Sequence, residues 1–193
     1  MSPEWVAAIA SAGTFVVIAA SAIAALMQLR HMRGSNQIIA LTECRETLES
    51  PEFRDAQRFV SFELPKRLED PEECRKAATL PFSGEYQAIG TVANFFESMG
   101  LFVKSGIIDR HIACDFWSFV VLRNWNALLP VTTFVRETVK SDALWENFEY
   151  MAALSQQFTE QHASSYPTGT ARMPEDRSLL EKLEKYSRDH ART

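Results

Sequence analysis

The sequence has little cysteine and no excess of basic residues. Its three cysteines, Cys44, Cys74 and Cys114, are widely separated and form no Cys-x-x-Cys pair. The sequence therefore shows neither a disulfide framework nor the ligand spacing of a zinc finger. Lys and Arg number 20 against 25 Asp and Glu, which gives a net charge of −5. Nucleic-acid-binding surfaces usually need the opposite balance, so we expect reduced thiols and no nucleic-acid partner.

The signature motifs of common enzymes are also missing. The sequence contains no GxxxxGK[ST] phosphate loop, GxGxxG turn, GxSxG elbow or HExxH helix, and no Glu-x-x-His pair for a di-iron bundle. His111 and Cys114 share a helix face, but a structural zinc site needs four ligands, so we interpret them as a surface His and a packed Cys. We interpret His31 as interfacial rather than as a haem ligand. We expect no catalysis, no cofactor and no metal.

Charge is absent from one long segment near the N-terminus. Residues 5–29, WVAAIASAGTFVVIAASAIAALMQL, contain no charged side chain. As a helix this run would be about 37 Å long, which exceeds the hydrocarbon core of about 30 Å. Its strongly apolar side chains favour insertion by on the order of several kcal/mol; they are Val6, Ile9, Phe15, Val16, Val17, Ile18, Ile23, Leu26 and Leu29. We expect residues 1–33 to form a membrane anchor.

Two other interpretations of this run are less consistent with the sequence. A signal peptide has basic residues before its apolar core, and residues 1–4 contain no Lys or Arg. A buried core helix usually keeps a polar face, and this run has none. Arg30, His31 and Arg33 follow the run whereas only Glu4 precedes it. The positive-inside rule then predicts a single-pass protein whose N-terminus lies outside and whose residues 30–193 lie in the cytoplasm.

The rest of the chain is predicted to be all-α, because no segment alternates with period two over a useful length. We expect a helical bundle domain over residues 34–163, whose first segment can continue the membrane helix. Residues 164–178 are rich in Pro, Gly and small polar residues and are predicted to be a linker. Residues 179–193 form an amphipathic tail helix that docks either on its own domain or on a partner.

Cap residues predict where several bundle helices begin. Ser50 followed by Pro51 is typical of a helix start. A further helix is expected from about Ser83 to Ser105, with one apolar stripe formed by Ile89, Val92, Ala93, Phe96 and Met99.

The end of that helix and the start of the next are predicted by a short turn. Gly106 can adopt positive φ and end the helix, with Ile107 making the accompanying apolar contact. Asp109 is expected to cap a helix over residues 110–129.

Later boundaries are predicted from proline and small polar residues. We expect Pro130 to end the helix over 110–129 and Thr132 or Thr133 to begin another. Ser141 and Asp142 are then expected to introduce a last bundle helix.

The two helices that Gly106 joins are predicted to form an antiparallel hairpin. Its contact is expected to bury Phe96, Met99, Leu101 and Phe102 against Ile112, Phe116, Phe119 and Val120. Glu97 lies beside the apolar stripe, and a buried carboxylate needs a partner. Arg123 is the expected partner, with the indole of Trp117 or Trp125 as a second donor. A catalytic acid would need a second titratable group and a pocket, so we interpret Glu97 as structural.

The region from about residue 85 to 140 resembles a bacterial family of unknown function, made of small helical proteins with one N-terminal membrane helix. The resemblance depends on a Phe-Phe-Glu segment, a Gly-x-Ile-Asp turn and an Arg-x-Trp pair, here Phe95, Phe96, Glu97, Gly106, Ile108, Asp109, Arg123 and Trp125. It implies the architecture of anchor and helices, a place in the bacterial inner membrane with the N-terminus in the periplasm, and no enzymatic activity. Phe95, Phe96, Glu97, Arg123 and Trp125 are the expected fold-defining cluster.

Small residues in the anchor suggest that it packs against other helices. Ala8 and Ala12, Ala20 and Ala24, and Ser21 and Ala25 are spaced at i, i+4, which lets a second helix approach closely. We expect an accessory or interaction subunit, in contact with membrane lipid and with other membrane subunits or copies of itself. The alternative is a membrane-tethered sensor or effector in signalling or defence, whose helical domain binds a cytoplasmic ligand or partner.

Overall fold

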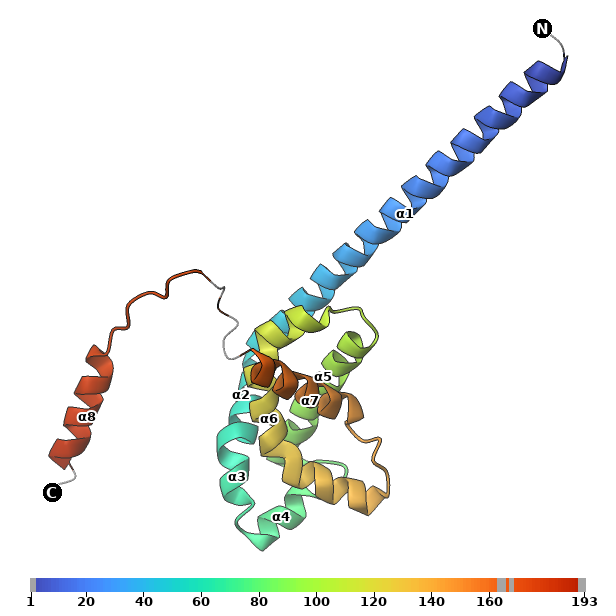
Figure 1. Cartoon of the computed structure of the whole chain (residues 1–193). Coiled ribbons are helices and arrows are strands. Elements are labelled where there is room, and N and C mark those ends of the chain that lie inside the picture. Colours follow the sequence, from blue (N-terminus) through green and yellow to red (C-terminus); the bar gives the residue numbers. More distant parts are fainter. Residues whose placement is uncertain (1–2, 163–165, 167–168, 191–193) are drawn as a thin grey trace. The chain divides into compact units, whose positions relative to one another are not determined.

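In the computed structural model, residues 3–162, 166 and 169–190 are described, and every regular element among them is a helix (Figure 1). The all-α prediction is confirmed. The chain consists of two compact units, Met1–Ala163 and Ser164–Thr193. The first contains helices α1 to α7, and the second contains α8.

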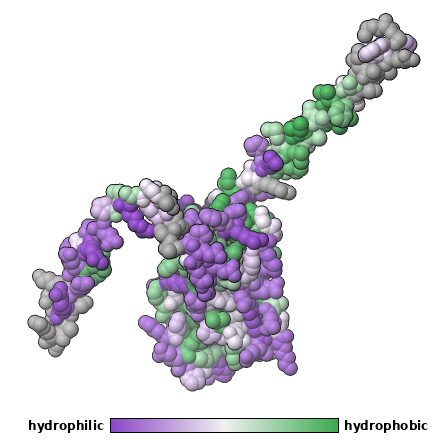
Figure 2. Space-filling model, in the orientation of Figure 1, coloured by the Kyte–Doolittle hydropathy of each residue, from purple (hydrophilic) through white to green (hydrophobic). Residues whose placement is uncertain are grey.

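Helix α1, Pro3–Glu49, runs without a break through residues 3–33 of the predicted anchor and beyond them. By length and composition it can cross a membrane. Its large apolar side chains between Phe15 and Leu29 are all more than half exposed, and Figure 2 shows hydrophobic residues along this part of the helix. Near its C-terminal end Ala40 and Cys44 are buried in the core of the bundle. One helix therefore connects the apolar segment to the bundle.

The next segment is helical from residue 51 to 77 with one interruption. Helix α2, Pro51–Arg58, begins at the predicted cap, where the Ser50 hydroxyl accepts from the N–H of Phe53 at 3.2 Å. A π-helical turn, Phe59–Glu63, leads into α3, Leu64–Arg67. Helix α4, Pro71–Ala77, follows after a short turn.

Helix α5, Gln87–Lys104, follows a 3₁₀ turn, Gly84–Tyr86, and buries the whole predicted apolar stripe. Gly106 ends it with φ of 74°. The N–H groups of Gly106 and Ile107 then bond back to Val103 and Phe102 at 3.1 and 2.9 Å, which is the Schellman pattern. The expected apolar contact of Ile107 is wrong, because Ile107 is exposed and Ile108 is the buried residue.

Helix α6, Arg110–Val139, begins at the predicted Asp109 cap but does not end at Pro130. Figure 1 shows that α6 changes direction along its length instead, as a helix does around an internal proline. Thr132 and Thr133 lie inside the helix, where their hydroxyls donate to Leu128 and Leu129 carbonyls at 2.9 Å. Burial of Val131, Thr132 and Val135 against the core explains why the helix continues.

Helix α7, Glu146–Gln161, begins four residues later than predicted and packs against both α5 and α6. The predicted hairpin contact is therefore wrong in part. Phe96 and Met99 are buried, but Leu101 and Ile112 are exposed, and Phe116 and Phe119 are 67% and 75% exposed. Helix α6 turns another face inward, made of Ala113, Cys114, Trp117, Ser118, Val121, Asn124 and Leu128.

The second unit contains α8, Ser178–His190. Its apolar residues Leu179, Leu180, Leu183 and Tyr186 are exposed. Residues 163–165, 167–168 and 191–193, which belong to the predicted domain end, linker and tail helix, lie outside the described residues. The described residues 169–177 of the predicted linker are not helical.

Candidate functional site

The most extensively bonded side chain between two helices of the bundle is Glu97 on α5. Its Oε2 accepts from the backbone N–H groups of Asn147 and Phe148, at 3.0 and 2.9 Å. Its Oε1 accepts from the side-chain amide of Asn147 at 2.7 Å. All three donors belong to the first turn of α7, where N–H groups have no partner within their own helix. Glu97 thus caps α7 from a neighbouring helix, and its charge complements the helix dipole.

Helix α7 needs this cap because the residue that precedes it cannot provide one. Trp145 occupies the cap position and has no side-chain oxygen to accept from the first turn. The polar pair Ser141 and Asp142 lies too far upstream, and the Ser141 hydroxyl accepts only from the N–H of Ala143, at 3.4 Å. A carboxylate from α5 takes the position that a Ser or Asp usually fills.

Trp145 has a left-handed backbone, with φ of 56° and ψ of 35°, which is strained for an aromatic residue by about 1–3 kcal/mol. Two contacts and burial hold it in this conformation. The indole N–H donates to Asn94 Oδ1 at 3.0 Å, the ring stacks on Phe82, and the side chain is buried. Asn94 and Glu97 are three residues apart on α5, so one face of α5 fixes both the strained residue and the helix start.

The same face of α5 approaches α7 unusually closely at Gly100. A Cβ built on Gly100 would lie 2.0 Å from the carbonyl oxygen of Asn147, so only glycine fits. One turn further, the Lys104 ammonium donates to the Asn147 side chain at 3.2 Å. We call Asn94, Glu97, Gly100 and Lys104 the α5 stripe. The segment from Trp145 to Phe148 packs against this stripe.

Arg136 holds the turn before α7 from the opposite side. Its Nε donates to the carbonyl of Leu144 at 2.8 Å, and its Nη1 to Glu149 at 2.7 Å. The turn over residues 141–145 is therefore fixed by α5 and by the end of α6.

Phe148 brings together most of the predicted aromatic cluster. Its ring stacks on Phe96 with centroids 4.9 Å apart and meets the edge of Trp125 at 5.0 Å. Phe95 contacts Phe96 at 5.1 Å and Phe53 at 4.8 Å. Sequence reasoning missed Phe148, which is fully buried at the centre of this group.

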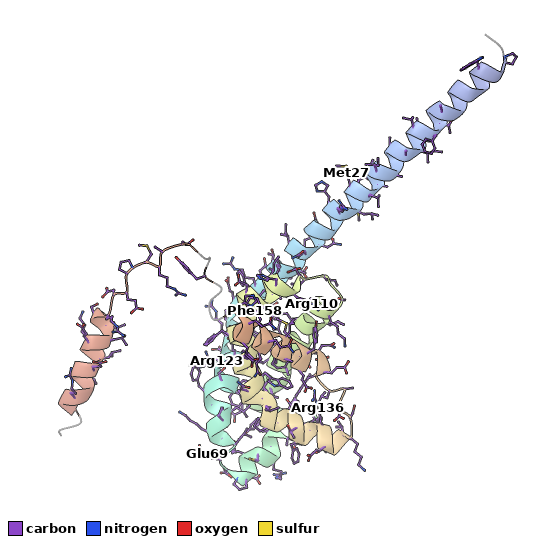
Figure 3. All side chains as sticks on the ribbon, in the orientation of Figure 1. Met27, Glu69, Arg110, Arg123, Arg136 and Phe158 are labelled. Atoms are coloured by element: carbon purple, nitrogen blue, oxygen red, sulfur yellow. The ribbon has the colours of Figure 1, made fainter. Side chains whose placement is uncertain are left out.

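The predicted pairing of Arg123 with Glu97 is wrong. Arg123 is exposed, and its guanidinium lies over the ring of Phe62 at 4.5 Å; Figure 3 places it on the outside of the bundle. The face of α6 that turns inward presents the neighbouring Asn124 instead, which is fully buried. Neither Trp117 nor Trp125 is among the three donors to Glu97.

A family model described as "Domain of unknown function (DUF4760)" matches residues 15–155. The chain belongs to this family. The resemblance to a family of unknown function is thereby confirmed. The DUF4760 match begins inside α1 and ends inside α7, so it includes the α5 stripe and the start of α7 and leaves α8 outside. Searches of curated proteins and of solved structures gave no match.

The DUF4760 region also contains a polar cluster on Glu73 of α4. The carboxylate accepts from Lys76 at 2.7 Å, from the Tyr86 hydroxyl and from Arg67 at 3.3 Å. These bonds connect α3, α4 and the 3₁₀ turn before α5. The hydrogen bond from Lys76, followed by that from Tyr86, lowers the pKa of Glu73 to about 2.

This lowered pKa predicts an acid-sensitive bundle. A carboxylate with a folded pKa near 2 and an unfolded value near 4.5 contributes stability above pH 4.5 that is lost as the pH falls towards 2. Glu73→Gln should lower the unfolding temperature at neutral pH and flatten its decline across this pH window. Thermal unfolding followed by circular dichroism checks both effects. A variant that keeps the full acid-dependent decline would contradict the assignment.

A cavity of about 470 Å³ lies beside the Pro130 bend within the DUF4760 match. Its lining comes from α3–α4 and α6 and is mainly apolar: Leu68, Pro71, Cys74, Arg75, Ala78, Pro130, Val131 and Phe134. The volume falls within the range of small-molecule sites.

His111 and Cys114 do not point to a shared site. His111 is exposed and its ring meets the edge of Phe158 at 5.3 Å. Cys114 is buried, and burial raises the pKa of its thiol. Within the described residues, no three or more His, Cys, Asp or Glu side chains gather as a metal site would require.

The small residues of α1 lie on an open surface. Ala12, Ala20, Ala24 and Ala25 are exposed, and so is Ser21, whose hydroxyl donates to the Val17 carbonyl at 2.8 Å. The side chain of Ala8 lies outside the described ones. The exposed Ala and Ser side chains leave room for close approach of another helix.

Proposed function

We propose that the protein is a membrane-anchored interaction subunit without catalysis of its own, which assembles with itself or with a larger membrane complex. The observation that carries this proposal is α1. Its large apolar side chains from Phe15 to Leu29 are exposed, and the same helix enters the bundle core without a break. Such a helix transmits any association in the membrane to the bundle.

We also propose that the anchor lies in the bacterial inner membrane with the bundle in the cytoplasm, and two observations support the span and its orientation. The DUF4760 match includes the apolar stretch from residue 15 onwards, so much of the anchor belongs to the family domain. Arg30, His31 and Arg33 follow the stretch, in agreement with the positive-inside rule.

The hydrogen bonds of Glu97 support a structural role for this side chain. Both of its oxygens accept from amide groups of α7. It serves to hold α7 on α5, which fits an interaction module better than an acid–base site, since catalysis would need a second titratable group beside it.

The proposal is tested by extracting the full-length protein from its native membranes into nanodiscs and identifying what co-purifies by mass spectrometry. Recovery with a defined complex, or as a homo-oligomer of fixed size, is the expected result. A protein recovered only as a monomer would contradict it.

The small-residue face of α1 predicts where the helices meet. Ala20→Leu with Ala24→Leu should lower the oligomeric or complexed fraction, because larger side chains prevent close approach. Ala22→Leu is the matched control, since residue 22 points to the opposite side of the helix. Native mass spectrometry of the nanodisc samples measures the fractions. Equal fractions in both variants would exclude this face as the contact.

The cavity beside Pro130 favours a second candidate function, a membrane-tethered sensor or effector in signalling or defence. Its volume and mainly apolar lining suit a small ligand with an apolar body, and Arg75 in its lining, which also pairs with Glu72 at 2.7 Å, suits an acidic group. The same extraction discriminates the two functions. A retained small molecule on a monomeric protein would favour the sensor, and a protein partner with no retained molecule would favour the subunit.

A further inference from the structure

We infer that the end of the bundle where α5 turns into α6 rests on the bilayer surface and binds the headgroups of anionic lipids. This inference depends on the proposed membrane span. The surface concerned, which we call the membrane-proximal end, consists of Gln37 on α1 and of Lys104, Ile107, Arg110 and His111 around the turn.

The position of this end follows from the continuity of α1. The uncharged run ends at Leu29, and Gln37 comes eight residues later in the same helix. This separation is about 12 Å along the helix axis. The headgroup layer on each side of a bilayer is about 5–8 Å thick. Gln37 therefore lies just outside the headgroups when the apolar run fills the hydrocarbon core.

The turn between α5 and α6 lies directly against Gln37. One shallow surface hollow is lined jointly by Gln37 and by residues of the turn: Val103, Lys104, Gly106, Ile108, Asp109, Arg110 and His111. Figure 1 shows the turn at the end of the bundle from which α1 leaves, and Figure 3 places Arg110 there and Glu69 at the other end. Long basic side chains at this level can reach the phosphate groups.

The chemistry of the turn suits a lipid surface. Ile107 lies at the tip of the turn, is 44% exposed, and is not among the apolar residues that pack against the core of the described bundle. Its N–H bonds to the carbonyl of Phe102, so the turn is held in a fixed shape that presents the side chain outward. Lys104 and Arg110 flank it, and both are exposed, although the Lys104 ammonium also contacts Glu146 at 3.5 Å and Asn147 at 3.2 Å. Apolar tips flanked by basic residues are typical of surfaces that bind anionic membranes.

The charges near the turn favour anionic lipid further. Arg30 and His31 occupy α1 just below Gln37. Two acidic residues lie near the turn. Glu146 pairs with Lys104 at 3.5 Å, and Asp109 faces its own helix, since its carboxylate accepts from the N–H groups of His111 and Ile112 at 2.9 and 3.1 Å. The opposite end of the bundle, around Glu69 and Asp70, then faces away from the membrane, and so does the nearby cavity.

The test uses the full chain in nanodiscs of phosphatidylcholine with phosphatidylglycerol, with an environment-sensitive fluorophore on one introduced cysteine. Ile107→Cys reports on the turn, Glu69→Cys is the control at the opposite end, and Ile18→Cys reports on the span. Cys74→Ser is included in every variant, whereas the buried Cys44 and Cys114 are retained. An otherwise identical protein without the introduced cysteine gives the background.

Nitroxide lipids measure depth. Headgroup nitroxide should quench the label at position 107 several-fold more than the label at 69, and Arg110→Glu should reduce that difference. Acyl-chain nitroxide should quench the label at 18. If the label at position 18 is quenched but headgroup nitroxide quenches the labels at positions 107 and 69 equally, the surface contact is overturned while the anchor stands. If acyl-chain nitroxide does not quench the label at position 18, the proposed anchor is wrong, and the inference about the surface is wrong with it. A blue-shifted label at 107 without headgroup quenching would mean that protein, and not lipid, covers the turn.

Discussion

Replacing Glu97 by Ala should lower the free energy of unfolding of the bundle by about 2–4 kcal/mol. The change removes three hydrogen bonds to a charged acceptor at once. Hydrogen bonds to charged groups contribute about 1.5–3 kcal/mol each, and the loss of a helix cap alone costs about 0.5–2 kcal/mol. The contributions are not additive, since all three donors lie in one helical turn.

The same change should have a local signature that a general loss of packing would not produce. The amides of Asn147 and Phe148 should exchange with solvent faster than other amides of α7, because their acceptor is gone. Hydrogen exchange followed by mass spectrometry of the α7 peptides measures this effect, and denaturant titration of the tryptophan fluorescence measures the stability.

One further variant separates the charge of Glu97 from its hydrogen bonds, and a second is a control at an exposed carboxylate. Glu97→Gln keeps one acceptor oxygen for the backbone N–H groups, so it should lose less stability than Glu97→Ala. Glu137→Ala removes an exposed carboxylate on α6 and should change the free energy by no more than about 0.5 kcal/mol. If Glu97→Ala were as mild as Glu137→Ala, the cap would not stabilise α7.

The helix boundaries that could be predicted from sequence depend on local chemistry. Ser50, Gly106 and Asp109 each act within a few residues of their own position, through a hydroxyl, a positive φ or a carboxylate. Pro130 predicted the wrong boundary because its local helix-breaking effect competes with tertiary packing of the residues that follow it. The residues that follow it are buried against the core. The free energy gained by that burial exceeds the free energy lost with one helical hydrogen bond.

The partner of Glu97 could not be found from side chains alone. Sequence reasoning correctly expected a partly buried carboxylate that needs donors, but it searched for a charged residue and chose Arg123. The actual donors are mainly backbone groups about 50 residues away. One signal was present: the segment Leu144-Trp145 before α7 contains no cap residue, so the cap had to come from elsewhere in the fold.

Gly100→Ala should destabilise the bundle by about 2–4 kcal/mol, because overpacking costs about 1–3 kcal/mol and the displaced cap adds to it. Elsewhere in a helix the same change usually stabilises by about 0.5–1 kcal/mol. Here the new Cβ would lie 2.0 Å from the Asn147 carbonyl oxygen. Backbone atoms of two packed helices cannot yield as the end of a side chain can. Helix α7 would have to move away from α5, and Asn147 would leave Glu97.

Whether Gly100→Ala lowers or raises the free energy of unfolding tests the close packing of α7 against Gly100. Gly34→Ala in α1 is the matched control, because nothing lies within 4 Å of a Cβ built there, and it should leave stability unchanged or slightly raised. Denaturant unfolding of both variants gives the comparison. The double variant Glu97→Ala with Gly100→Ala should lose less than the sum of the two single losses, since both act on the start of α7. Additive losses would mean that the two residues stabilise different parts of the bundle, and a Gly100→Ala variant as stable as Gly34→Ala would mean that α7 does not approach α5 at this point.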